Sequence, residues 1–166
     1  MVEHKISFRL RPVEARDERL VWEWSNDPVM LQFSFQTKEK IPWENHQKWF
    51  AKTLAKQGRI QYIAETPMGE PIGQVRFEPI DSDVSVISVY LAEAWRGKKL
   101  APVLIQRGVE RIAEETNVRI IEAWIKTENA ASRRAFLAAG FEMLEQTIYL
   151  GQSAWHLQKK YTIARR

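Results

Sequence analysis

Apolar residues recur along this chain with two periods, one typical of strands and one typical of helices. The run Val84–Leu91 is rich in β-branched residues and predicts a buried strand. Over Leu100–Thr116 apolar residues recur three or four positions apart, which predicts a helix with one buried face. A short basic loop containing Arg96, Lys98 and Lys99 joins the two. We expect the rest of the chain to be organised around this strand, loop and helix.

The same two periods predict the elements on either side of this segment. Strands are expected at Lys5–Val13, Ile60–Thr66, Pro71–Glu78, Val118–Ile125, Phe141–Leu150 and Ala154–Ile163. Helices are expected from the N-cap Asp17 through Trp24, over Trp43–Lys56 and over Ala130–Ala139. Asn26-Asp27-Pro28 is expected to end the first helix, because the residue before proline disfavours the helical conformation, and Val29–Lys40 is expected to be irregular. With no repeat or linker, residues 1–166 are predicted to form a single α+β domain.

The composition allows a sizeable core and excludes several classes of protein. Of the 166 residues, 45% are hydrophobic, so one domain can fold without disulfides. The chain has no cysteine, which excludes a disulfide scaffold, a cysteine-bound metal and an acyl-cysteine mechanism. Its three histidines, His4, His46 and His156, lack the spacing of metal ligands, so no metal is expected.

Hydropathy and charge indicate a soluble protein with an anionic ligand. No apolar run approaches the about 20 residues of a membrane span, and Met1–Leu10 carries charges where a signal peptide would be apolar. We therefore expect a cytoplasmic protein that does not bind membranes. The net charge of +4 is spread along the chain, which suits an anionic ligand but does not indicate nucleic acid.

The basic loop has the features of an anion-binding site. A helix N-terminus presents unpaired N–H groups and a partial positive charge, and here Arg96, Lys98 and Lys99 precede it. Together these groups predict binding of a polyanion such as a pyrophosphate. The alternative is a solvated loop that only connects the strand to the helix, since basic loops are common.

The loop also resembles a known motif. Arg96-Gly97-Lys98-Lys99-Leu100-Ala101, between a strand and a helix, is similar to the acetyl-CoA loop of the GNAT superfamily of N-acetyltransferases. The pattern of that loop is Gln/Arg-x-x-Gly-x-Gly/Ala. Arg96 and Ala101 fit this pattern, whereas Lys99 stands where the first glycine is expected. Lys99 therefore needs an allowed backbone conformation at a place where glycine usually removes the steric constraint.

A second block points to the same superfamily. The segment Asn129–Phe141 resembles the block in which an asparagine opens the helix after the fifth strand and Gly-Phe closes it. Asparagine and glycine are also ordinary cap residues, so either end alone could belong to any short helix. The two blocks occur in the expected order, each after a predicted strand. The resemblance covers about residue 10 to the end and implies the GNAT fold, a mixed, mostly antiparallel seven-stranded sheet flanked by about four helices.

The resemblance implies that a substrate amine attacks acetyl-CoA directly, without a metal or an acyl-enzyme. The residues implied to bind acetyl-CoA are Leu91, Arg96, Gly97, Lys98, Lys99, Leu100, Ala101, Asn129, Ser132 and Phe136. Phe136 stands where the superfamily often has a tyrosine that protonates the departing thiolate. Tyr90 and Tyr149 are alternative donors, or none is needed, because a thiol pKa of about 8.5 makes the thiolate a tolerable leaving group.

Two further groups are needed for the reaction. The superfamily polarises the thioester carbonyl with a backbone N–H at the strand end, here near Leu91. The amine must lose a proton, usually to a carboxylate through water. The carboxylates on predicted central strands are Glu65, Glu78 and Glu122, of which Glu78 and Glu122 are our candidate bases. The alternative is that these side chains lie on a solvated face of the sheet.

The N-terminal half suggests which amine is acetylated. Its segments Trp22–Pro28, Ser34-Phe35, Ile41–Phe50 and Ile72–Phe77 resemble a branch that acetylates nucleotide-linked amino sugars in pseudaminic-acid-type biosynthesis. The implied acceptor is the 4-amino group of a UDP-linked sugar, with Asn26, Ser34 and His46 as candidate substrate-binding residues. Ribosomal-protein N-terminal acetyltransferases share part of the pattern, so a protein N-terminus or another small amine is an alternative. A non-catalytic acyl-CoA-binding protein is a further alternative. The sequence leaves the oligomeric state open between a monomer and a homodimer.

Overall fold

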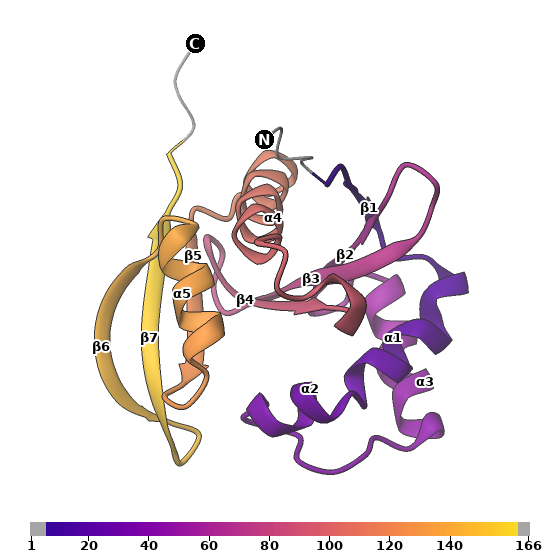
Figure 1. Cartoon of the computed structure of the whole chain (residues 1–166), viewed down its shortest axis with the longest axis horizontal. Helices are drawn as coiled ribbons and strands as arrows, with labels where there is room; N and C mark the ends of the chain where they lie inside the picture. The colour runs from indigo at the N-terminus through magenta and orange to yellow at the C-terminus, as the bar shows by residue number, and fades with distance from the viewer. Residues whose placement is uncertain (1–5, 163–166) are drawn as a thin grey trace.

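One sheet of seven strands runs through the protein in the order β1-β2-β3-β4-β5-β7-β6 (Figure 1). The computed structural model describes residues 6–162. The strands are β1 (Arg9–Pro12), β2 (Ile60–Glu65), β3 (Pro71–Pro79), β4 (Val84–Leu91), β5 (Ile120–Lys126), β6 (Glu142–Tyr149) and β7 (Gln152–Lys160). The helices are α1 (Glu18–Ser25), α2 (Pro28–Phe33), α3 (Trp43–Leu54), α4 (Ala101–Glu115) and α5 (Ala130–Ala138), with 3-10 turns η1 (Ala15–Asp17) and η2 (Glu93–Trp95).

The pairing of the strands confirms the mixed, mostly antiparallel sheet. In the described part of the chain, β4 and β5 form the one parallel pair, and every other neighbouring pair is antiparallel. A parallel pair needs a crossover connection, which α4 supplies. The last strand, β7, lies between β5 and β6 rather than at the edge of the sheet.

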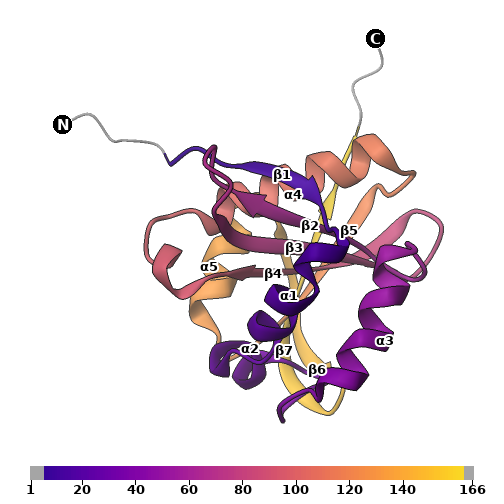
Figure 2. The ribbon, with the colours of Figure 1, turned by 90° about the vertical axis from the view of Figure 1, so that its right-hand side faces the viewer.

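Helices cover both faces of the sheet (Figures 1 and 2). On one face α4 and α5 pack over a core that includes Val75, Ile87 and Ile121. On the other face α1 and α3 pack around Ile63 and Tyr90. Because successive side chains of a strand point to opposite faces, neighbouring residues of β3, β4 and β5 belong to different layers. This alternation decides which side chains can meet.

The segment after the first helix is more ordered than its sequence predicted. α2 forms where irregular chain was expected, so the described residues contain five α-helices rather than about four. The side chain of Asp27 caps it by accepting a hydrogen bond from Val29 N at 2.9 Å. Pro28 occupies the first helical position, where its missing N–H costs nothing. The proline that ends one helix therefore begins the next.

The other elements lie within a few residues of their expected ranges, except that β1 begins only at Arg9. Lys5 and Ile163, expected at the outer ends of the first and last strands, lie outside the described residues. Asp17 precedes α1 as expected, but its side chain makes no cap hydrogen bond there. Its carboxylate accepts instead from Glu14 N at 2.8 Å.

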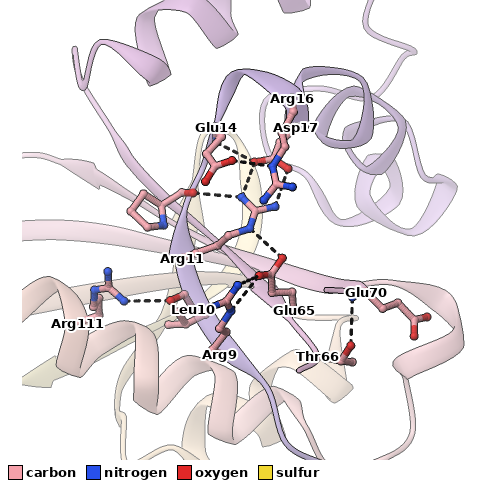
Figure 3. Close-up of polar contacts among 11 residues, drawn as sticks. Arg9, Leu10, Arg11, Glu14, Arg16, Asp17, Glu65, Thr66, Glu70 and Arg111 are labelled. Atoms are coloured by element: carbon pink, nitrogen blue, oxygen red, sulfur yellow. Dashed lines mark hydrogen bonds and ion pairs between the residues drawn. The ribbon is translucent and has the colours of Figure 1, made fainter. Parts of the chain in front are cut away.

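Buried ion pairs join β1 to β2 and to the first helical turn (Figure 3). Glu65 accepts hydrogen bonds from Arg9 at 2.6 Å and from Arg11 at 2.9 Å. Arg11 also donates two bonds to Asp17, at 2.7 and 2.8 Å. The hydrogen bonds from Arg11 and Arg9 hold the pKa of Glu65 below its ordinary value. The Glu65 and Arg11 side chains are only 3% and 11% exposed, so solvent screens their ion pair little, whereas Arg9 is 71% exposed.

We predict that Glu65→Gln lowers the free energy of unfolding by about 3 kcal/mol at pH 7, because it leaves the Arg11 charge buried with a weaker partner. A lowered folded pKa gives stability that is present above the unfolded pKa of about 4.3 and is lost as the pH falls through the folded pKa. The difference from wild type should therefore shrink below about pH 4. Urea unfolding at several pH values measures this difference.

The control is Glu70→Gln on the exposed β2–β3 turn, which should change the free energy of unfolding by less than about 0.5 kcal/mol. Equal losses of stability in both variants would contradict this account.

Candidate active site

A cavity of about 560 Å³ opens where β4 and β5 separate. The two strands pair only over Val84–Val86 and Ile120–Glu122, and beyond this they diverge (Figure 1). Residues of both helix layers line the cavity together with residues of the two strands. Its volume is typical of small-molecule sites, which range over about 300–1,000 Å³. The divergence of the two strands therefore creates the candidate site.

The main chain of β4 presents unpaired groups to this gap. Ala92 N donates to Ile72 O at 2.9 Å, just beyond the last paired residues of β3 and β4. Because the direction of the main-chain groups alternates along an antiparallel strand, those of Val89 and Leu91 point away from β3. The carbonyl of Leu91 accepts a bond from Arg96 Nε at 2.9 Å on that side. The N–H of Leu91 is therefore directed into the gap.

The loop between β4 and α4 forms a concave array of N–H donors. Gly97 and Lys99 both have left-handed backbones, with φ of 74° and 59°. Within residues 6–162, the N–H groups of 97–101 donate no main-chain hydrogen bond. Consecutive free N–H groups in such a conformation make a nest for an anion, and the exposed side chains of Lys98 and Lys99 lie beside it. Lys99 adopts here the conformation that glycine would adopt more easily.

Arg96 lines the cavity and also connects the loop to two other elements. Its guanidinium donates to Leu91 O at 2.9 Å and to Asp27 Oδ2 at 2.8 Å. It also lies 5.3 Å from the centre of the Tyr90 ring, whose hydroxyl donates to the same Asp27 oxygen at 2.6 Å. Arg96 therefore ties the loop to the end of β4 and to the start of α2. An anion at this loop would be bound by backbone N–H groups and lysines.

Asp27 is a residue that sequence reasoning missed. Burial opposes its ionisation, yet hydrogen bonds from Tyr90, Val29 N and Arg96 lower its pKa below the ordinary value. Its carboxylate is thus charged and joins α2 to β4 and to the loop. The available signal was its position before Pro28, which is typical of a helix N-cap. That signal says nothing of a partner 69 residues away.

The start of α5 forms another wall of the cavity. The side chain of Asn129 accepts a hydrogen bond from Ser132 N at 3.2 Å and so caps the helix. Phe136 is buried and packs edge-to-face against Phe141, with ring centres 5.0 Å apart. Asn129, Ser132 and Phe136 all line the cavity, whereas Leu100 is buried in the core. Phe136 offers an apolar wall and no proton.

On the face covered by α1 to α3, the cavity is aromatic and charged. Glu78 is the one carboxylate among its lining residues in the described chain, and its side chain is 40% exposed. Trp124 and Tyr149 stack with ring centres 4.3 Å apart, and Phe35 meets Tyr149 edge-on at 5.0 Å. The buried Lys126 donates from Nζ to Gln32 O at 3.0 Å. This half of the cavity can hold a polar ligand against flat apolar surfaces.

The two candidate bases differ in their surroundings. Glu122 lies on the same face of the sheet as Glu78, but its carboxylate accepts hydrogen bonds from His156 at 2.9 Å and Gln158 at 3.2 Å. It is not among the residues that line the cavity. Glu65 belongs to the ion-pair network of β1 and β2. Glu78 is therefore the carboxylate that a ligand in the cavity can reach.

The two candidate proton donors, Tyr90 and Tyr149, differ in whether their hydroxyl groups already have a hydrogen-bond partner. The hydroxyl of Tyr90 donates to Asp27, and burial and this bond raise the pKa of Tyr90. Tyr149 lines the cavity, and within residues 6–162 its hydroxyl makes no hydrogen bond. Burial, with a smaller effect of the Glu78 charge, raises the pKa of Tyr149. Tyr149 is thus the tyrosine available to a ligand.

Two of the three polar residues expected to bind substrate have structural roles. Asn26 makes hydrogen bonds to Ile41, accepting from its N at 2.7 Å and donating to its O at 3.3 Å. His46 is 2% exposed and its Nε2 lies 2.7 Å from Glu18 O, and burial lowers its pKa. Both lie outside the cavity lining, so we do not retain them as substrate-binding residues. Ser34 does line the cavity, although its Oγ also accepts from Gln36 N and Thr37 N.

Two negative findings apply to the described residues. No group of three histidine, aspartate or glutamate side chains within 6–162 is arranged to hold a metal ion. In the same range, each helix is too short or too polar to cross a membrane.

Known proteins resemble this chain over most of its length. Residues 7–142 match the family model of the acetyltransferase (GNAT) domain. The L-methionine sulfoximine/L-methionine sulfone acetyltransferase of Pseudomonas aeruginosa is 30% identical over 132 residues, which cover 76% of each protein. Spermidine N-acetyltransferase from Vibrio cholerae, solved with CoA and spermine, superposes with a TM-score of 0.83 at 17% identity, over 92% of this chain and 95% of that one.

A second solved structure has the same fold. AAC(6')-Ib in complex with ribostamycin and coenzyme A gives a TM-score of 0.80 at 22% identity, over 93% of each chain. The family match covers the diverging strands, the loop of free N–H groups and the start of α5 that together line the cavity. The protein belongs to the GNAT family and is an acetyl-CoA-dependent N-acetyltransferase.

Proposed function

We propose that this enzyme acetylates the primary amine of a small molecule, using the loop of residues 97–101 to bind the pyrophosphate of acetyl-CoA. The supporting observation is the gap between β4 and β5, which joins the half of the cavity beside α4 and α5 to the half beside α2. Acetyl-CoA would enter from the first half and the amine from the second. The N–H of Leu91 would donate to the thioester oxygen as negative charge develops there.

Glu78 is our proposed base. Its carboxylate would take a proton from the substrate ammonium, directly or through a water molecule. The neutral amine would then attack the thioester carbon, the C–S bond would break to release the CoA thiolate, and the positively charged nitrogen would lose its second proton to water or to the thiolate, leaving the neutral amide. Phe136 cannot protonate this thiolate, but a thiol pKa of about 8.5 allows it to leave unaided near neutral pH.

The specific acceptor that we propose is the 4-amino group of a UDP-linked amino sugar, as the resemblance of the N-terminal half implied. Phe35, Trp124 and Tyr149 offer surfaces for stacking, and Lys126 offers a positive charge. A second candidate is an amino acid analogue, because the Pseudomonas aeruginosa relative is named for acetylating L-methionine sulfoximine. A polyamine is disfavoured by charge, since Glu78 is the one acid lining the described cavity.

An acceptor comparison tests this proposal. With acetyl-CoA saturating, we expect kcat/KM for a UDP-linked 4-amino sugar to exceed that for a peptide with a free N-terminus by at least about a hundredfold, or about 2.7 kcal/mol of transition-state binding. L-methionine sulfoximine and spermidine are tested as acceptors in the same assay. If kcat/KM is higher for L-methionine sulfoximine, the acceptor is an amino acid analogue and not the sugar. If it is higher for the peptide, the enzyme acetylates protein N-termini.

Glu78→Gln should lower kcat/KM by about 10²- to 10⁴-fold at neutral pH, because the amine loses its base. The deficit should shrink as the pH rises toward the pKa of the amine, where more of it is already neutral. Glu122→Gln is the matched control, since it removes a strand carboxylate on the same face but outside the cavity. A steady-state pH profile of both variants checks this, and a larger loss in Glu122→Gln would reverse the assignment.

Reversing the charges of Lys98 and Lys99 together (K98E/K99E) should weaken acetyl-CoA binding by more than about tenfold, or 1.4 kcal/mol, because two cations beside the proposed pyrophosphate site become anions. Calorimetry measures this affinity. The control K48E/K52E makes the same change in net charge on the exposed side of α3 and should bind normally. If the loop variant, still folded, binds with wild-type affinity, the phosphates must be bound elsewhere.

A further inference from the structure

Two arginines beside the acceptor half of the cavity share a single carboxylate. Arg76 lies on β3, two residues before Glu78, and Arg59 immediately precedes β2. The Nε atoms of Arg76 and Arg59 lie 3.4 and 3.9 Å from Glu78 Oε1. Both guanidinium groups also pack on Trp49 of α3, at 5.4 and 4.3 Å from the ring centre. We call these three charged side chains with Trp49 the arginine cluster.

Within the arginine cluster, the positive charges and the Nε donors are not fully matched by acceptors. Neither Nε atom makes a hydrogen bond within the described chain, although both are buried, because the contacts to Glu78 are long or poorly aligned. Burial lowers the pKa of both arginines, and the charge of Arg76 further lowers that of Arg59. Arginine nevertheless stays protonated in proteins. The cluster therefore combines two positive charges, on side chains that are 18% and 25% exposed, with one negative charge, which leaves a net charge of +1.

A ligand can reach the arginine cluster from the cavity. Arg76 and Glu78 both line the cavity, and their side chains are 25% and 40% exposed. Packing against Trp49 restricts the two guanidinium groups, which reduces the entropy lost when they bind. A planar guanidinium matches a carboxylate or phosphate with two parallel hydrogen bonds. The cluster thus has the charge, the access and the rigidity of an anion subsite next to the proposed base.

We propose that Arg76, with Arg59 behind it, binds an anionic group of the acetyl acceptor and places the acceptor amine at Glu78. This inference rests on the proposed function, and it restricts the acceptor to amines that also carry a carboxylate or a phosphate. Both chemistries occur among the candidates, in an amino acid analogue and in a nucleotide-linked sugar. The bound anion supplies the missing negative charge, so that Glu78 no longer has to balance two arginines and can interact with the ammonium.

Two pairs of acceptors that differ in the anionic group test the subsite. The first pair is L-methionine sulfoximine and its carboxamide, and the second is a UDP-linked 4-amino sugar and the same sugar without the nucleotide. Binding to the CoA-saturated enzyme is measured by calorimetry, and acetylation is measured separately. We expect the anionic member of at least one pair to bind at least about tenfold more tightly, and the pair that shows this identifies a carboxylate or a phosphate as the ligand.

Variants then assign the preference to the arginines. Arg76→Gln and Arg59→Gln should remove most of the difference within the pair, and Arg76→Lys, which keeps the charge but not the two parallel donors, should retain part of it. The matched control is Arg133→Gln, because Arg133 also packs on a tryptophan, 4.6 Å from the Trp155 ring centre, with an unbonded Nε. It lies on α5, outside the acceptor half, and its removal should leave the preference unchanged.

The outcomes separate this inference from the proposed function. Wild-type enzyme that binds both members of each pair equally would overturn the subsite even if acetylation proceeds. If the arginine variants lose affinity equally for charged and neutral acceptors, the subsite is also overturned, because the arginines would then only position Glu78. Selective binding of the anionic member without acetylation would support the subsite while contradicting the proposed acceptors.

Discussion

The parallel pairing of β4 and β5 stops after three residues on each strand, and the rest of the site depends on this. If the pairing continued, the main-chain groups of Val89 and Leu91 would bond to β5 and no gap would exist. Because the pairing stops, those main-chain groups remain available and the gap between the strands connects the two faces of the sheet. A cavity that joins both layers lets one ligand approach from α4 and α5 while another approaches from α2.

A charged contact connects these two halves. Arg96 belongs to the loop before α4, Asp27 begins α2, and Tyr90 lies on β4 between them, with all three side chains meeting at one Asp27 oxygen. Hydrogen bonds to an ionised carboxylate are about twice as strong as neutral ones. The loop that would bind CoA and the helix that borders the acceptor are therefore positioned by the same group. Arg96 holds the loop through this contact, and its partly exposed side chain also lines the cavity.

Charge is distributed unequally along the cavity. At its α4 end Gly97 and Ala101 line the cavity, and the exposed Lys98 and Lys99 lie between them in the loop of free N–H groups, which suits a pyrophosphate. At the other end Glu78 faces the cavity beside Arg76, so an ammonium and an anion can bind as neighbours. An amine that carries its own negative charge satisfies both groups at once. Glu78 lines the cavity, whereas Glu122 does not, and the Glu122 carboxylate already accepts hydrogen bonds from His156 and Gln158.

The sequence by itself determined most strands and helices, the basic loop and the positions of Asn129 and Phe136, because periodicity and capping act between residues close together in the chain. It also showed that Lys99 stands where glycine is usual, and the structure then gave Lys99 a left-handed backbone with φ of 59°. Only the tertiary structure decided which candidate glutamate lines the cavity and that His46 and Asn26 lie outside its lining. It alone revealed that Asp27 links β4 to the loop and that Arg59 and Arg76 lie beside the same carboxylate, Glu78. These depend on partners 15 to 69 residues apart, whose approach is set by strand order and by the end of the β4–β5 pairing.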